Sequence, residues 1–199
     1  MTFISYIQEI LISYSKVYHL IKRLKEEGNQ EKPSKIYQII SLLNNNVHGY
    51  FLIKGKNGVG KSTLCKELYF NDSYLKKEYK MFVPQDFTFI KGTVEENLMR
   101  DDLSKFSKLL DIIPELNTNL SEENDLSTGQ KAIINLIRQT NFEAQVIIID
   151  ELGANVDKNV RRHIEEFFVE YFSDRCIFEV THLEKGIVPS RIITDIIEV

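Results

Sequence analysis

The residues best suited to chemistry form a glycine-rich segment that follows a short apolar run. Its members are Gly55, Lys56, Asn57, Gly58, Val59, Gly60, Lys61, Ser62 and Thr63. The spacing G-x-x-x-x-G-K-S is that of a phosphate-binding loop, whose backbone N–H groups turn inward around an anion. We expect Gly55, Gly58 and Gly60 to take backbone dihedrals that a Cβ would forbid. The Lys61 ammonium can then reach the β- and γ-phosphates of a nucleoside triphosphate, and the Ser62 hydroxyl can ligate Mg²⁺.

A second chemical group, the acidic pair Asp150 and Glu151, follows the apolar run 146–149. A continuous β-branched run is typical of a central parallel strand that is buried on both faces. An aspartate at the end of such a strand can hold Mg²⁺. A glutamate directly after it can orient and deprotonate an attacking water. The alternative is that the pair is simply solvated, but the phosphate-binding loop in the same chain favours the catalytic interpretation.

The elements that must position these residues alternate between strand and helix. We expect strands at 50–53, 80–84, 146–149, 176–180 and 192–199, and helices directly after the loop and over 158–172. This alternation predicts an α/β fold with a doubly wound, mostly parallel sheet. Ligand chemistry is expected at the carboxyl ends of its strands.

A polar, helical stretch interrupts the alternation, and we expect a small helical subdomain inserted at about 92–140. Thr93 and Glu96 have the spacing of a capping box, which predicts a helix from Thr93 to about Arg100. A second helix is expected over 103–113, closed by Pro114. Ser127 is well placed to cap a further helix, whose positive end would face an anion.

The first 34 residues have a different character from residues 35–199, which we assign to the nucleotide-binding domain. Apolar side chains recur at helical spacing over 3–24, and a charged linker follows over 25–33. Packing on the chain's own domain and docking on a partner remain equally open for this amphipathic helix. Residues 36–43 fit a strand or a short helix, and their pattern does not decide between the two.

Composition excludes some classes of function. The formal net charge of −4 gives no electrostatic reason to expect nucleic-acid binding. Cys65 and Cys176 lack metal-type spacing and suggest reduced thiols in a cytosolic protein, with Cys65 serving packing. No run approaches the ~18 apolar residues of a membrane span, and the first residues do not resemble a signal peptide.

Taken together and in order, the motifs resemble those of the nucleotide-binding domain of ATP-binding cassette (ABC) proteins, over residues 36–199. Residues 55–63 match the first nucleotide motif, Gln85 the glutamine of the Q-loop, and residues 126–130 the signature motif. Residues 146–151 match the second nucleotide motif, residues 154–157 the D-loop, and His182 the switch histidine. Each motif alone is weak, whereas the ordered set is highly specific. The resemblance implies the P-loop NTPase fold, with ATP and Mg²⁺ as ligands.

The resemblance also implies roles for single residues. In the family, two such domains pair head to tail and enclose ATP between them. Lys61, Gln85, Glu151 and His182 would then act in catalysis, and Ser62, Gln85 and Asp150 would serve Mg²⁺. Ser127, Gly129 and Gln130 would reach the nucleotide from the opposite subunit.

A finer resemblance concerns the subtype. Residues 83–98 are similar to the Q-loop region of exporter-type ATPases, including peptide exporters, and residues 13–33 look like the juncture that follows their last membrane helix. Met1 would then follow the place of those membrane helices. This implies an ATP-hydrolysing subunit that drives export, with a peptide as one candidate cargo, through a separate membrane-spanning partner. Such a subunit would form a homodimer or pair with another ATPase domain. It would be cytoplasmic and peripheral on the inner face of the cell membrane.

The sequence departs from the family pattern at several positions. Thr128 replaces the usual first glycine of the signature motif, and Leu152-Gly153 replaces the usual Pro-Thr. Tyr37 is the only candidate for an aromatic residue that stacks on adenine, and it lies unusually near the loop. Two alternatives stay open: a non-transport ABC ATPase in DNA repair, translation or phage defence, and a regulatory ATP-binding module without turnover.

Overall fold

The computed structural model describes residues 39, 48–72, 75–86, 88–122, 125–153 and 155–199. These residues lie in one compact unit, Gln38–Val199. The helix expected over 3–24, the linker at 25–33, nearly all of 36–43 and the candidate Tyr37 lie outside the described residues. Within the described ranges, no helix has the length and apolar character needed to cross a membrane.

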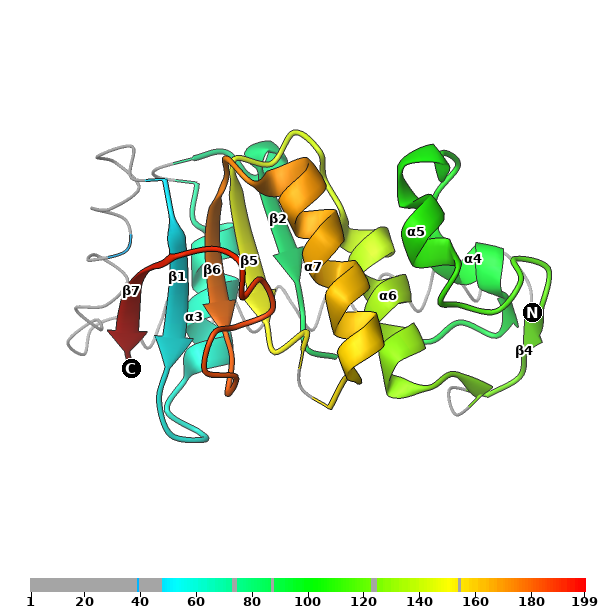
Figure 1. The fold of residues 1–199 in the computed structure, drawn as a ribbon, viewed down its shortest axis with the longest axis horizontal. Coiled ribbons are helices and arrows are strands. Elements are labelled where there is room, and N and C mark those ends of the chain that lie inside the picture. The colour runs from blue at the N-terminus through cyan, green and yellow to red at the C-terminus, as the bar shows by residue number, and fades with distance from the viewer. Residues whose placement is uncertain (1–38, 40–47, 73–74, 87, 123–124, 154) are drawn as a thin grey trace. The chain divides into compact units, whose positions relative to one another are not determined.

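A five-stranded parallel sheet forms the centre of the fold (Figure 1), which confirms the predicted α/β class. Its strands are β1 (Tyr50–Lys54), β2 (Lys80–Val83), β5 (Val146–Asp150), β6 (Cys176–Val180) and β7 (Ile193–Glu198). Their spatial order is β2-β5-β6-β1-β7. The chain therefore leaves β1 for the far edge of the sheet, returns through β5 and β6, and adds β7 on the other side of β1.

The register of the strands brings the functional segments together. Asp150 pairs with Val180, and Val180 pairs with Ile53, so the carboxyl ends of β5, β6 and β1 lie next to one another. In an open α/β sheet this is where ligands bind. The glycine-rich loop follows β1, Glu151 follows β5, and Thr181-His182 follows β6.

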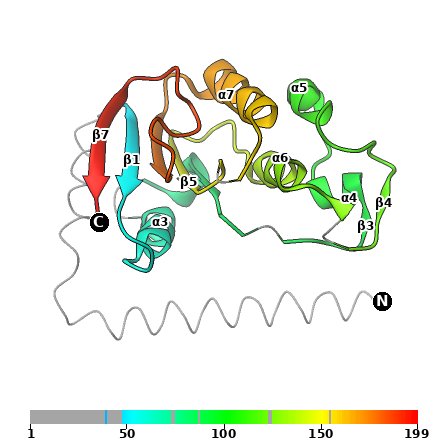
Figure 2. The same ribbon diagram turned by 60° about the horizontal axis from the view of Figure 1, so that its bottom comes forward.

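Helices cover both faces of the sheet. Helix α3 (Lys61–Phe70) lies on one face and α7 (Lys158–Phe172) on the other (Figure 2). Helix α6 (Thr128–Gln139) packs on β2, α7 and α4 (Val94–Leu98). Asp157 caps α7, because its carboxylate accepts hydrogen bonds from the N–H groups of Asn159 (2.8 Å) and Val160 (3.0 Å).

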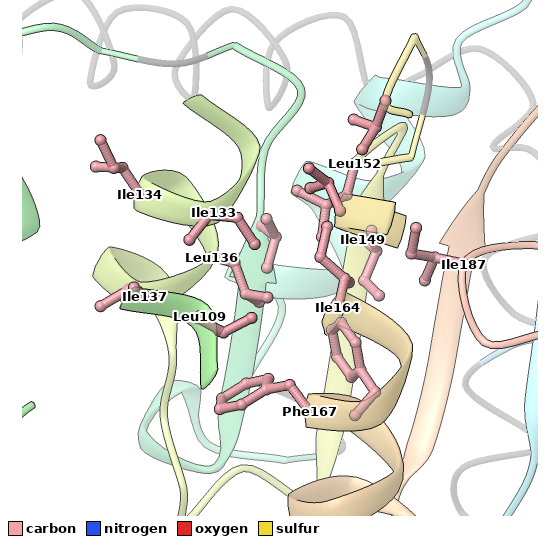
Figure 3. Packing of buried hydrophobic residues seen from close by; sticks show 14 of the residues in the cluster. Leu109, Ile133, Ile134, Leu136, Ile137, Ile149, Leu152, Ile164, Phe167 and Ile187 are labelled. Carbon is pink, nitrogen blue, oxygen red and sulfur yellow. The ribbon is translucent and has the colours of Figure 1, made fainter. Parts of the chain in front are cut away.

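The core on the α7 side joins the helices to the sheet (Figure 3). Most of its members are buried branched and aromatic side chains, at positions that recur along one face of each helix. Members shown in the close-up include Ile133, Leu136, Ile149, Ile164 and Phe167. Burying each such side chain stabilises the folded state by about 1.5–3 kcal/mol, so this core fixes α6 and α7 against the ends of the strands.

The stretch between β2 and β5 contains short elements. Helix α4 (Val94–Leu98) begins with the predicted capping box at Thr93, but it ends before Arg100 because Met99 takes a left-handed φ of 54°. The single helix expected over 103–113 is wrong. It is replaced by the 3-10 turn η2 (Ser104–Phe106) and the short helix α5 (Ser107–Leu110).

Hydrogen bonds explain the shorter elements. The N–H groups of Ile112 and Ile113 bond three residues back, to Leu109 and Leu110, which tightens the chain into a turn instead of continuing the α-helix. A two-stranded antiparallel pair, β3 (Gly92–Thr93) and β4 (Asn119–Leu120), closes the stretch. The sequence pattern did not indicate this pair.

Candidate nucleotide-binding site

The glycine-rich loop runs between β1 and α3, as the sequence predicted. Gly58 and Gly60 have φ values of 81° and 97°, in the left-handed region that favours glycine. Gly55 is different, because its φ is not positive and a Cβ there would lie 2.5 Å from the backbone oxygen of Val199. The expectation of a special dihedral at Gly55 is therefore wrong. Close approach of the C-terminal strand requires this glycine instead.

Lys61 opens α3 and folds back across the loop. Its Nζ donates hydrogen bonds to the backbone oxygens of Gly55 (3.0 Å) and Lys56 (2.9 Å). Residues 56–59 of the loop are exposed, while Lys61 is itself buried. The loop thus joins the positive end of a helix, backbone N–H groups and an ammonium, which together suit a phosphate chain.

Asp150 and Ser62 meet behind the loop. The two side chains are joined by a hydrogen bond, and Asp150 is only 2% exposed. Burial raises the pKa of the Asp150 carboxyl, the bond from Ser62 opposes that shift, and the neighbouring charge of Glu151 adds to it. A carboxylate in this position is costly without a cation beside it.

These two side chains fit Mg²⁺. Asp150 Oδ1 is buried, and no hydrogen-bond partner for it lies among the residues that the structure describes. The donor set of a carboxylate and a hydroxyl contains only oxygen, which is what this hard cation prefers. Magnesium also keeps several waters and phosphate oxygens as ligands, so it does not need a cluster of protein carboxylates.

The Glu151 carboxylate contacts two other predicted site residues. Its Oε2 accepts a hydrogen bond from Gln85 Nε2 at 3.0 Å, and its Oε1 lies 3.1 Å from His182 Nε2. Its backbone has a φ of 55°, which is uncommon for a residue with a side chain, and its N–H donates to Val180 O at 2.9 Å. Three predicted site residues from three separate segments are therefore in direct contact.

Helix α6 holds the segment that carries Gln85. Asn135 Nδ2 donates to Pro84 O at 2.8 Å, and Arg138 Nη1 donates to Thr88 O at 2.6 Å. Both donors are in the later turns of α6. The position of Gln85 is thereby linked to the helix that begins at the signature-like motif.

The signature-like residues do not join this cluster. Ser127 and Gln130 form a capping box with each other, and Gln130 also donates to Ile112 O at 3.4 Å. Gly129 is buried against α7, where a Cβ would lie 2.9 Å from Val160 Cγ2. In Figures 1 and 2 the start of α6 lies apart from the loop after β1, while Ser127 and Thr128 are exposed.

Sequence reasoning missed several residues near the site. It predicted Ser127 as a helix cap and as a signature residue, but not that Ser127 and Gln130, at S-x-x-Q spacing, form a capping box with each other. The charges of Lys66 and Asp86 also act on Asp150, in opposite directions. The buried Glu179 in β6 was missed as well, and its signal was a carboxylate within an apolar strand.

Comparison with known proteins identifies the family of this chain. The sequence profile of the family described as ABC transporter matches residues 37–154, which is more than half of the chain. The chain is 28% identical over 147 residues to the "Probable peptide export ATP-binding protein YydI" of Bacillus subtilis, covering 65% of this chain and 68% of that protein. It is 27% identical over 164 residues to the "Energy-coupling factor transporter ATP-binding protein EcfA1" of Mycoplasma genitalium, covering 67% of this chain.

Other relatives are much longer than this chain. The chain spans 60% of the length of EcfA1 and 11% of the "ABC transporter C family member 3" of Arabidopsis thaliana, to which it is 25% identical. A solved bacterial Atm1-family ABC exporter with ATP bound has the same fold, with a TM-score of 0.55 at 19% identity. That match covers 70% of this chain and 30% of the exporter chain. The chain belongs to the ABC transporter family and is an ATPase domain of that family.

Proposed function

We propose that this chain is the ATP-hydrolysing subunit of an exporter-type ABC transporter and that it works with a separate membrane-spanning partner. The observation that carries the proposal is the contact of Gln85 and His182 with the carboxylate of Glu151, directly beside the buried pair Ser62 and Asp150. In this proposal Glu151 is the base, and the contacts support it because they lie at one edge of the sheet, next to the glycine-rich loop and the candidate cation site.

The loop and Lys61 bind the triphosphate. The N–H groups of residues 55–63 and the start of α3 favour negative charge, and the Lys61 ammonium exchanges its loop carbonyls for β- and γ-phosphate oxygens. Binding therefore breaks two hydrogen bonds from the ammonium to neutral carbonyls and replaces them with bonds to negatively charged phosphate oxygens.

Ser62, Gln85 and Asp150 would hold Mg²⁺, which when bound neutralises charge on the phosphates. Glu151 orients the attacking water and accepts its proton. Gln85 and His182 hold the carboxylate of Glu151 from two sides before ATP enters. When ATP is bound, His182 Nε2 turns its proton toward the γ-phosphate, where charge develops during transfer.

The signature-like residues act on a second subunit. Ser127 and Thr128 are exposed at the start of α6. Ser127, Gly129 and Gln130 would contact the nucleotide held by the loop of a paired domain. The proposal is supported by their position apart from the loop of their own chain.

The transport role is supported by the relatives. YydI carries the name of a peptide export ATP-binding protein, whereas EcfA1 is named for an energy-coupling factor transporter. We infer export as the direction, with a peptide as the first cargo to test. The chain would be cytoplasmic and held at the inner face of the cell membrane by its partner, and the helix expected over 3–24 is the candidate docking element.

Mixing two inactive variants tests the shared site. Lys61→Ala removes the loop lysine but leaves the signature-like motif, and Ser127→Arg does the reverse. A random mixture should recover roughly a quarter of wild-type ATPase activity, because half of its dimers are mixed and each of those has one intact site. The matched control mixes Lys61→Ala with a variant of the same loop, Ser62→Ala, and should recover nothing.

The outcome separates the two geometries. Activity in the first mixture above the sum of its separate components supports a site built from two chains. No gain in either mixture contradicts the shared site. Full activity of Ser127→Arg alone would show that each chain completes its own site.

A further inference from the structure

The apolar strand β6 contains a fully buried carboxylate, Glu179, which is 0% exposed. It lies on the face of the sheet that α7 covers, close to Tyr50 of β1, which is also fully buried. The Tyr50 hydroxyl donates a hydrogen bond to Glu179 Oε2. Burying a carboxylate is costly unless it is well bonded, so this pair calls for a physical reason.

The other hydrogen bonds to Tyr50 and Glu179 come from one loop, which follows β6. The N–H of Ile187 donates to both carboxylate oxygens of Glu179, at 3.1 Å and 2.9 Å. The N–H of Val188 donates to Tyr50 Oη at 3.3 Å. The Thr181 side chain also bonds to Glu179. The pair therefore holds residues 181–188, the segment that begins at the end of β6 and carries His182.

The same loop fits tightly against the turn that follows Glu151. Ile187 is fully buried, and a Cβ added at Gly153 would lie 2.7 Å from its Cδ1. Figure 3 shows Ile187 beside Leu152 and Ile149. Gly186 has a φ of 72°, and any side chain there would collide with the Tyr50 hydroxyl. The loop is thus fixed on one side by hydrogen bonds and on the other by packing.

We propose that Tyr50 and Glu179 are positioning residues, which hold the 181–188 loop so that His182 reaches Glu151 and the γ-phosphate. The inference rests on the role proposed for His182 above. The polar pair fixes the position of the loop, because a buried network in which every group is hydrogen-bonded specifies one arrangement of its partners. Without it, two loop N–H groups would lose their partners and would move toward water.

The test uses full-length variants. Glu179→Leu removes the carboxylate, Tyr50→Phe removes the hydroxyl alone, and Glu179→Gln keeps an oxygen that can accept from Ile187. The matched control is Thr140→Val, which removes another buried hydroxyl, bonded to Leu136 O at 2.7 Å, away from the site. Three quantities are measured: amide hydrogen exchange over 181–188, the ring NMR signal of His182, and kcat beside the Kd of Mg·ATP.

We expect Glu179→Leu to speed exchange over 181–188 and to lower kcat about tenfold, the lower end for partners that orient a functional group. The Kd of Mg·ATP should stay within about twofold, because the glycine-rich loop is untouched. The His182 signal, assigned by its loss in His182→Gln, should shift as it does in Glu151→Gln. Glu179→Gln should recover part of each effect, and Thr140→Val should alter thermal stability alone.

Each other result overturns the inference. Unchanged exchange over 181–188 in Glu179→Leu and Tyr50→Phe would show that the pair does not hold the loop. Faster exchange with unchanged kcat and an unshifted His182 signal would show that the loop does not position the histidine. If the wild-type chain does not hydrolyse ATP, the proposed function fails, while exchange and the ring signal still decide whether the pair positions His182. If Glu179→Leu does not fold, Tyr50→Phe and Glu179→Gln still decide whether the pair positions His182.

Discussion

His182 Nε2 lies 3.1 Å from Glu151 Oε1, and Gln85 Nε2 donates to the other oxygen of the same carboxylate at 3.0 Å. Both carboxylate oxygens of Glu151 therefore have a side-chain nitrogen of a separate segment within 3.1 Å. The Glu151 side chain is therefore held between segments that follow β2 and β6. A base that is fixed before its substrate arrives loses little entropy when the reaction begins.

The packing of α6 on α7 predicts a cost for enlarging Gly129. In Gly129→Ala the new Cβ would lie 2.9 Å from Val160 Cγ2, so we expect a loss of about 1–3 kcal/mol in unfolding free energy from overpacking. Adding Val160→Ala should relieve the contact, so the double variant should lose less than the sum of the two single losses. Denaturant unfolding of all four proteins measures this coupling. Additive losses would mean that the two helices do not meet here.

Glu179 predicts a specific dependence of stability on pH. Burial raises the pKa of its carboxyl above the ordinary 4.5, while the bonds from Ile187, Tyr50 and Thr181 and the charge of Arg161 oppose the rise. Between the ordinary and the raised pKa, the folded protein holds a proton that the unfolded chain has lost. The contribution of this group to stability is therefore present below about pH 4.5 and is lost as pH rises through the raised pKa.

Thermal midpoints across about pH 5 to about pH 8 test this sign. The wild type should lose stability toward the upper end relative to Glu179→Gln, which has no proton to lose. Glu165→Gln is the matched control, because Glu165 is a partly buried carboxylate that accepts from the Ser190 N–H at 2.9 Å. Parallel curves for the wild type and Glu179→Gln would show that Glu179 keeps one charge state across this range.

The sheet and most of the site could be predicted from the sequence, because their signals are local. The run 146–149 predicted a buried strand, and the loop spacing predicted the turn and the helix that begins at Lys61. For Gln85, Glu151 and His182 the sequence predicted only that they lie near one another, because parallel strands end at a common edge of the sheet. It did not predict their contact. The register of β5 against β6 pairs Asp150 with Val180 and so brings Glu151 next to the segment that carries His182.

The predictions that were wrong concern close contacts and local hydrogen bonds, which a sequence pattern does not encode. Gly55 must lack a Cβ because the backbone of Val199, which is distant in the sequence, lies close against it. The turns over 103–113 depend on three-residue hydrogen bonds that compete with an α-helix of ordinary propensity. The buried bond between Tyr50 and Glu179 could not be predicted, because only the fold brings these two positions together.

Nucleotide selectivity follows from the base-binding side of the site. Stacking on an aromatic platform contributes roughly 1–3 kcal/mol, and Tyr37, outside the described residues, is the only candidate in the sequence. We therefore expect ATP and GTP to compete with affinities that differ by less than about 100-fold. Displacement of a fluorescent nucleotide by each measures the ratio. A larger preference for ATP would reveal an adenine site that this account lacks.

The most direct test of the central claim is the steady-state ATPase rate of Glu151→Gln, measured beside its Kd for Mg·ATP. The variant keeps the shape of the side chain and removes the base, so we expect turnover to fall at least ~100-fold while nucleotide binding is retained. The matched control is Glu95→Gln, an exposed carboxylate in the first turn of α4, which should hydrolyse ATP at the wild-type rate. If Glu151→Gln also turns over at the wild-type rate, the residue that Gln85 and His182 hold is not the catalytic base.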